Sequence, residues 1–126
     1  MIFFMIKINK KQKELIENNA LALATVNEDG SPHCIAVGDV KVVEDGKLLI
    51  GDNYMAITCK NIIKNNKVAL AVWNKDWKKE CFGYEFFGTA EYFIKGKWLD
   101  KVKKAHIGFQ AKGAILVTIN KIKQLA

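Results

Sequence analysis

The residues best placed to do chemistry lie between Gly51 and Val72, a stretch that predicts a turn, a short amphipathic helix and a buried strand. Thr58 and Lys60 fall at the start of the predicted helix. We expect Asp52 or Asn53 to cap it, so that its first free N–H groups point out of the turn beside a hydroxyl and an ammonium group. Such donors at the positive end of a helix dipole suit a phosphate group. An ordinary capped surface helix with solvated lysines remains the alternative from this segment alone.

Helical spacing predicts a buried face and a solvated face for the same helix. The buried face is expected to carry apolar side chains: Met55, Cys59, Ile62 and Ile63. The solvated faces are expected to carry Thr58, Lys60, Asn61 and Lys64.

A second candidate for ligand contact is the long strand predicted from Pro32 to Val43. Most of its residues are apolar, which indicates a strand covered on both faces or one that presents a face to a ligand. Gly38 marks a bend, a bulge, or a close approach to something flat, and its position alone does not choose among them.

The elements that must position these residues are mainly strands. The other predicted strands span residues 21–26, 47–50, 67–73, 84–93 and 114–120, and further helices are predicted after Asn9, with Gln12 completing a capping box, and over 96–105. About six strands joined mainly by hairpins, with short helices between them, predict a mainly β protein built as a small antiparallel barrel. A length of 126 residues with 50% hydrophobic content fits a single domain over 1–126.

Composition narrows the classes of function. The net charge of +7 comes from 20 lysines with no arginine, and these lysines are dispersed, so sequence-specific nucleic-acid binding is not indicated. Cys34, Cys59 and Cys81 are too widely spaced for a zinc site or a disulfide framework, and we expect reduced, mostly buried thiols and no metal site. No apolar run approaches the ~20 residues of a membrane helix, and the short apolar start has no preceding charges, so we expect a cytoplasmic protein without a membrane partner.

The order of these pieces resembles the FMN-binding split β-barrel superfamily, which includes pyridoxamine-phosphate-oxidase-like proteins and small FMN-binding proteins. The likeness is carried by ALATVNEDGSPH (22–33), GKLLIGD (46–52), TCKNIIKNNKVAL (58–70), FFGTAEY (86–92) and AILVTI (114–119). Together these segments cover nearly the whole chain.

The resemblance implies an antiparallel, Greek-key split barrel and a homodimer with FMN at its interface. It implies that the flavin phosphate is held at the helix start by Ile57, Thr58, Lys60 and Asn61. The flavin ring is implied to lie along Ala36, Val37 and Gly38, and against the strand end at Gly51, Asp52 and Asn53. The aromatic strand and the 109–126 end are the expected partner-facing surfaces, and Trp73 and Trp98 are expected in ordinary core or rim packing.

The absence of arginine departs from true pyridoxamine-phosphate oxidases, which use arginines and a histidine for the substrate phosphate, so vitamin B6 oxidation is not expected. The first hypothesis is an FMN protein in electron transfer or a small flavin-dependent oxidoreductase with an unidentified redox partner. A non-enzymatic flavin store or redox sensor is the second, and a basic RNA-binding barrel is the third. Deazaflavin-using and haem-degrading relatives share the barrel. Asp39 and His33 could do acid–base chemistry, although a histidine after a turn is more often solvated.

Overall fold

The computed structural model describes residues 6–105 and 110–125, and short helices interrupt a run of antiparallel strands along them. In chain order the elements are α1 (Lys10–Glu17), β1 (Leu21–Val26), β2 (Pro32–Val37), β3 (Lys41–Glu44), β4 (Lys47–Asp52), α2 (Ile57–Lys64), β5 (Lys67–Trp73), β6 (Gly83–Phe93), α3 (Lys97–Ala105) and β7 (Gly113–Leu125).

The strands form one 7-stranded sheet in the order β2-β1-β5-β6-β7-β4-β3, with antiparallel pairing between neighbours. Strands β5, β6 and β7 lie side by side and β4 lies beside β7, which is the order of a Greek key. The predicted mainly β architecture is confirmed. The predicted number of six strands is wrong, because the long second strand is divided in two.

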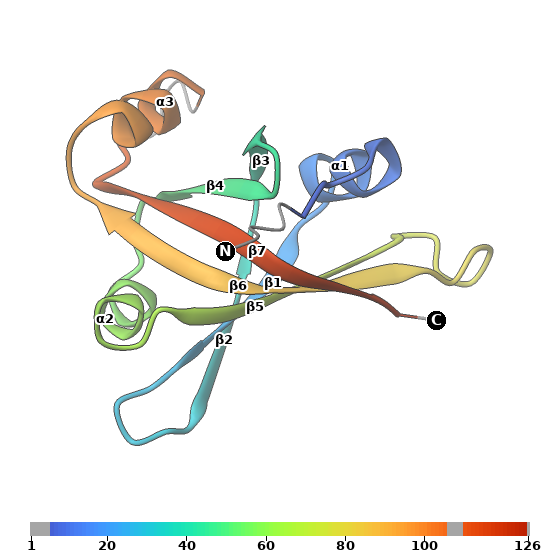
Figure 1. The fold of residues 1–126 in the computed structure, drawn as a ribbon, viewed down its shortest axis with the longest axis horizontal. Coiled ribbons are helices and arrows are strands. Elements are labelled where there is room, and N and C mark those ends of the chain that lie inside the picture. Colours follow the sequence, from blue (N-terminus) through green and yellow to red (C-terminus); the bar gives the residue numbers. More distant parts are fainter. Residues whose placement is uncertain (1–5, 106–109, 126) are drawn as a thin grey trace, which may run out of the picture.

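The division falls at Gly38 and Asp39, between the end of β2 at Val37 and the start of β3 at Lys41. Asp39 has φ 52°, a left-handed conformation that cannot continue a strand. Since β2 and β3 occupy opposite edges of the sheet but only residues 38–40 join them, the sheet must curl until its edges meet at this corner (Figure 1). No hydrogen-bonded ladder joins β2 to β3 in the described residues, so the sheet is not closed.

Alternation along the strands divides the buried side chains between two clusters. Leu48 and Ile50 of β4 enter the main core inside the curled sheet, whereas Leu49 between them packs in a second cluster beneath α3. The main core also holds Leu23, Leu70, Phe86, Ile115 and Val117, and the second cluster holds Trp98, Val102, Ala114 and Leu116. Strands β4 and β7 are therefore covered on both faces, which explains why β7 is apolar at consecutive positions.

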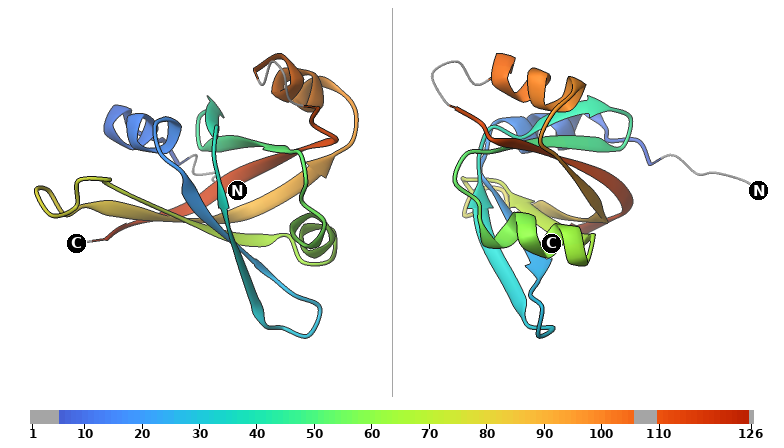
Figure 2. Two further views of the ribbon diagram at one scale, coloured as in Figure 1. Left: turned by 180° about the vertical axis from the view of Figure 1, so that it is seen from behind. Right: turned by 90° about the vertical axis from the view of Figure 1, so that its left-hand side faces the viewer.

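The three helices cover different parts of the sheet (Figure 2). Helix α1 contacts β3 and β5, α3 contacts β4 and β7, and α2 contacts β1 and β6. The predicted capping box of α1 is confirmed, because Asn9 Oδ1 accepts from the Gln12 backbone and Gln12 Oε1 accepts from the Asn9 backbone. Trp98 is buried in the core, whereas Trp73 lies at the rim, because β5 ends there and 50% of its surface is exposed. Both positions agree with the expected core or rim packing.

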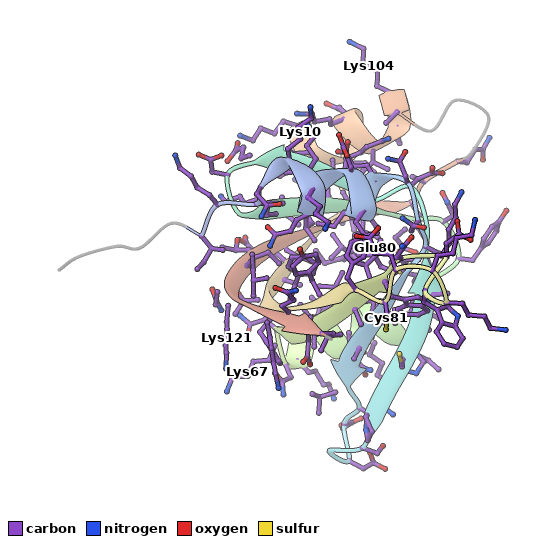
Figure 3. All side chains as sticks on the ribbon, turned by 90° about the vertical axis from the view of Figure 1, so that its right-hand side faces the viewer. Lys10, Lys67, Glu80, Cys81, Lys104 and Lys121 are labelled. Atoms are coloured by element: carbon purple, nitrogen blue, oxygen red, sulfur yellow. The ribbon has the colours of Figure 1, made fainter. Side chains whose placement is uncertain are left out.

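The charged surface follows the dispersed pattern expected from the sequence. Lys10, Lys67, Lys104 and Lys121 project outward from four different elements (Figure 3). Within 6–105 and 110–125, none of the helices has the length and apolar character needed to cross a membrane.

Candidate functional site

A cavity of about 550 Å³ opens at the corner where the two edges of the sheet approach each other. One wall is the end of β2 and the connection to β3, and the other is the end of β4 with the segment leading into α2. The lining residues are His33, Ile35, Ala36, Val37, Gly38, Asp39, Gly51, Asn53, Tyr54, Met55, Ala56, Ile57 and Thr58. A mainly apolar concave site of this volume has room for a ligand of cofactor size.

The cavity brings together the two distant segments that the sequence singled out. Of the predicted site residues, Ala36, Val37, Gly38, Gly51, Asn53, Ile57 and Thr58 line it. Asp52, Lys60 and Asn61 lie close to it in the sequence but do not line it. The two walls come from opposite edges of the sheet, so the three-residue connection after β2 is what places them together.

Gly38 contributes open main chain to the first wall. A Cβ atom built on it would meet nothing within 4 Å, and its φ is not in the left-handed region. The glycine therefore leaves space on the cavity side without being required by its own backbone conformation. Of the readings left open by the sequence, the bend and an open face toward a ligand both fit this position.

The start of α2 differs from the prediction. The helix begins at Ile57 after Ala56 as N-cap, and no side chain caps it, so the expected cap by Asp52 or Asn53 is wrong. The four N–H groups from the N-cap through the first turn have no acceptor within an α-helix, and among the described residues no side chain caps this helix. Because Ala56, Ile57 and Thr58 line the cavity, the positive end of α2 lies at its wall.

Asp52 is fully buried and turned away from the cavity. Its Oδ1 accepts from the Met55 backbone N–H at 2.8 Å, and its Oδ2 accepts from the Tyr92 hydroxyl at 2.5 Å and the Cys59 thiol at 3.0 Å. Burial, with the Asp52 hydrogen bond second, raises the pKa of the Cys59 thiol to about 12, and the same causes raise the pKa of Tyr92. Both groups therefore remain protonated donors at neutral pH.

Lys112, the residue before β7, also lies beside Asp52. Its Nζ lies 3.9 Å from Asp52 Oδ2 and donates to the Met55 carbonyl at 2.8 Å, and its backbone N–H donates to the Asp52 carbonyl at 2.9 Å. A half-exposed ammonium thus lies beside a buried carboxylate, and both hold the same residue of the second wall.

Lys60 and Asn61 lie on the side of α2 that faces the β1–β2 hairpin. Asn61 Nδ2 donates to Thr25 Oγ1 at 3.0 Å and to Asn27 Oδ1 at 2.9 Å, which fastens the helix to β1. Lys60 is exposed and lines a polar groove with Glu28 and Asn61. A hydrogen bond from Lys64, reinforced by the charges of Lys64 and Lys60, lowers the pKa of Glu28.

The predicted faces of α2 are wrong in part. Thr58 and Asn61 are buried together with Cys59 and Ile62, whereas Ile63 has 72% of its surface exposed. The polar contacts of Asn61 with β1 account for this orientation, since they turn its side of the helix inward.

Sequence reasoning gave too little weight to two lining residues, His33 and Tyr54, and it could not show the state of the predicted site residue Asn53. His33 lines the cavity half-buried, and Tyr54 lies at the cavity with 91% of its surface exposed. Asn53 Oδ1 is buried and has no hydrogen-bond partner in the described part of the chain, which is unusual for a buried amide oxygen. In the sequence, His33, Ile35 and Val37 alternate with residues that are also mostly apolar: Cys34, Ala36 and Gly38. This alternation is too weak to show that His33 faces inward.

The expectation of mostly buried thiols is also wrong. Cys59 is buried, but Cys34 and Cys81 are exposed. Cys34 lies on β2 at the edge of the sheet, and Cys81 lies in the turn before β6, and both are exposed among the described residues. Residues 109 and 126, the two ends of the predicted partner-facing segment 109–126, lie outside the described residues.

Comparison with known proteins places this chain in a family. The family model described as pyridoxamine 5'-phosphate oxidase matches residues 8–126. An uncharacterised protein of Methanocaldococcus jannaschii is 36% identical over an alignment that covers 96% of this chain and 83% of the relative. The chain therefore belongs to the pyridoxamine 5'-phosphate oxidase family, and the resemblance found in the sequence is confirmed.

Solved structures agree on the fold. HupZ of Group A Streptococcus superposes with a TM-score of 0.82 at 26% identity, covering 94% of each chain. An FMN-binding protein from Syntrophomonas wolfei subsp. wolfei superposes with a TM-score of 0.80 at 19% identity, covering 90% of this chain and 83% of its own. At that identity the second likeness shows the fold alone.

Proposed function

We propose that this protein binds FMN in the corner cavity and acts in electron transfer or as a small flavin-dependent oxidoreductase. The observation that carries the proposal is the juxtaposition, at one cavity, of an apolar wall and a helix start without a side-chain cap. A flat aromatic ring suits the first and a phosphate suits the second. Membership of the family supports this assignment.

The residues present fit the cofactor. Ala36, Val37 and Gly38 offer an open, apolar surface for the ring, and the absence of a Cβ at Gly38 leaves room against the main chain. The unpartnered Asn53 Oδ1 gives the second wall an acceptor whose side chain can turn to a polar ring edge. Thr58 and the free N–H groups of the first turn of α2 would hold the phosphate.

Lys60 has a different role from Thr58 in this proposal. It does not line the cavity, but it is exposed on the first turn of α2, so its charge favours an anion nearby without a fixed contact. Its contribution should weaken with salt, whereas that of Thr58 should not.

When bound, FMN supplies the transfer of electrons or of a hydride, and the chain binds, orients and shields it. Half-buried His33 lines the cavity wall, where its imidazole can form a hydrogen bond to a bound cofactor or substrate. The lack of arginine supports a substrate other than pyridoxamine phosphate.

We further propose that the protein is a homodimer whose partner covers the open side of the cavity. Tyr54 and Ile57 line the cavity and have 91% and 53% of their surfaces exposed. Large apolar side chains at the mouth of a site are typical of a surface that another chain covers. The aromatic strand and the 109–126 end remain predicted partner surfaces. A cytoplasmic location remains a proposal as well.

The first test is the visible absorption spectrum of the purified protein, followed by chromatography of the small molecule released by heat. A flavin spectrum with release of FMN supports the proposal. A colourless protein that fails to take up added FMN contradicts it, and deazaflavin, haem and RNA would then be tested in turn. For an FMN-loaded protein, anaerobic bleaching by a reduced nicotinamide supports an oxidoreductase, and binding without reduction by donors supports storage or sensing.

The second test separates the phosphate from the ring. Thr58→Ala should weaken FMN binding roughly 10- to 100-fold, the value of one hydrogen bond to a charged group, and should leave riboflavin binding unchanged. Thr89→Ala, on β6 and away from the cavity, is the matched control. Lys60→Ala should weaken FMN binding less and only at low salt. Equal losses for FMN and riboflavin in Thr58→Ala would contradict the phosphate assignment.

A further inference from the structure

The buried carboxylate of Asp52 lies directly behind the second wall of the cavity. Of the residues from Gly51 to Thr58, Asp52 alone does not line the cavity, and its side chain is completely buried. The second wall is thus the segment between β4 and α2, and the side chains of Asp52 and Lys112 hold it through the Met55 backbone.

Each contact of Asp52 holds a different point of this segment. The Met55 N–H fixes the turn that precedes α2, and the Cys59 thiol fixes the first turn of the helix. The Tyr92 hydroxyl connects both to β6, which lies in the middle of the sheet. Lys112, the residue before β7, donates a further hydrogen bond to the Met55 carbonyl.

The packing around Tyr92 shows that this arrangement is tight. A Cβ built on Gly113 would lie 2.3 Å from the Tyr92 hydroxyl oxygen, so the glycine leaves the space that the ring occupies. Gly113 is also the direct β-sheet partner of Asp52. The Tyr92 ring therefore packs against the backbone of Gly113, the strand partner of the residue to which its hydroxyl donates.

We infer that Asp52, with the donors Tyr92 and Cys59, is a positioning anchor that sets the start of α2 for binding the phosphate of the cofactor. This inference rests on the proposed binding of FMN. The N–H groups of the first turn are free because no side chain caps them, so their direction depends on how the preceding segment is fixed. Asp52, Tyr92 and Cys59 fix that segment without lining the cavity, which makes them positioning residues.

The high pKa of Cys59 and Tyr92 is consistent with this role. Because burial keeps both groups protonated, each can donate to the carboxylate across the neutral pH range. A hydrogen bond to a charged acceptor is among the stronger contacts in a protein interior, so its loss should be measurable.

The test uses variants that remove one donor at a time. Tyr92→Phe removes the hydroxyl and keeps the ring, Cys59→Ala removes the thiol, and Cys59→Ser restores a donor of similar size. Tyr84→Phe is the matched control, because Tyr84 lies on the same strand with no hydrogen-bond partner for its hydroxyl in the described residues. FMN and riboflavin affinities are measured by flavin fluorescence for each variant.

We expect Tyr92→Phe and Cys59→Ala each to weaken FMN binding by about tenfold, from the loss of one charged hydrogen bond, and to change riboflavin binding by less than about twofold. Cys59→Ser and Tyr84→Phe should bind FMN as the wild type does. Equal losses for FMN and riboflavin, or no loss for either, would overturn the inference, since a purely structural role does not discriminate the phosphate.

Amide hydrogen exchange of the protein without ligand separates this inference from the proposed function. In Tyr92→Phe and Cys59→Ala, the Met55 amide and those of the first turn of α2 should exchange faster, and amides in the centre of β6 should not. If the wild type binds no flavin, FMN binding is refuted, and these rates still decide whether Asp52 anchors the segment. Unchanged exchange at Met55 refutes the anchor even where FMN binds.

Discussion

Gly38→Ala separates the ligand-binding role of this glycine from any role in folding. A Cβ at this position meets no protein atom within 4 Å. The φ angle of Gly38 is outside the left-handed region, so alanine can adopt this backbone conformation without strain. The apo protein should therefore keep its stability or gain about 0.4 to 1 kcal/mol, since alanine restricts the unfolded chain. In the proposed complex the same methyl group points into the space of the flavin ring.

The cost to binding follows from overpacking. Inserting a methyl group into a filled site costs about 1 to 3 kcal/mol, which corresponds to a roughly 5- to 150-fold weaker affinity. We expect FMN and riboflavin to lose affinity together, because the ring and not the phosphate meets the new methyl. Fluorescence titration measures both affinities, and thermal unfolding of the apo protein measures stability.

Gly96→Ala is the control with the opposite signature. Gly96 has φ +96° and no neighbour within 4 Å of a Cβ, and it does not line the cavity. This substitution should lower stability by about 1 to 2 kcal/mol through backbone strain and leave flavin affinity unchanged. If Gly38→Ala binds both flavins like the wild type, the ring does not lie over this part of the first wall.

Three further predictions concern the thiols, the alkaline range and the dimer. At neutral pH a thiol reagent should label Cys34 and Cys81 quickly and Cys59 slowly, as followed by mass spectrometry of digests; fast labelling of Cys59 would contradict its burial. The pKa of Cys59 rises from 9.0 in the unfolded chain to about 12, so its stabilising effect is complete below pH 9 and is lost as pH rises toward 12. Because serine does not titrate there, the stability of the wild type relative to Cys59→Ser should fall over that window, and a constant difference would refute the shift. Ile57→Glu should raise the dimer dissociation constant by about tenfold or more, and Ile63→Glu on the same helix should not. Analytical ultracentrifugation would measure the dimer dissociation constants of both variants. Equal effects of the two substitutions would show that the interface does not lie at the cavity mouth.

The sequence was most informative where structure is decided locally. The capping box of α1 depends on Asn9 and Gln12, three residues apart, and it is present as predicted. Strand β1 covers the predicted residues 21–26, because its apolar run and the following turn are both local signals. By contrast, the break after β2 depends on the left-handed conformation of Asp39, which a run of apolar residues on either side conceals.

The residue patterns alone indicated two segments of the site, and only the family resemblance implied that they meet at one ligand. The sequence selected residues 36–38 and 51–53, yet their meeting depends on the curl of the whole sheet. Likewise the exposure of Cys34 depends on β2 lying at an edge, which is a property of strand order. Such features arise from long-range pairing and leave no periodic signal in the residues concerned.

Asp52 shows why a sound local rule failed at the start of α2. An aspartate shortly before a helix is a common N-cap, because its carboxylate can accept the free N–H groups of the first turn. Here the carboxylate accepts instead from Tyr92, which lies 40 positions later in the chain, and from the Cys59 side chain. The helix start loses its cap to a tertiary contact, and its first residues line the cavity. A local motif that is overridden in this way beside a cavity is itself an indication of function, because free N–H groups there are available to a ligand.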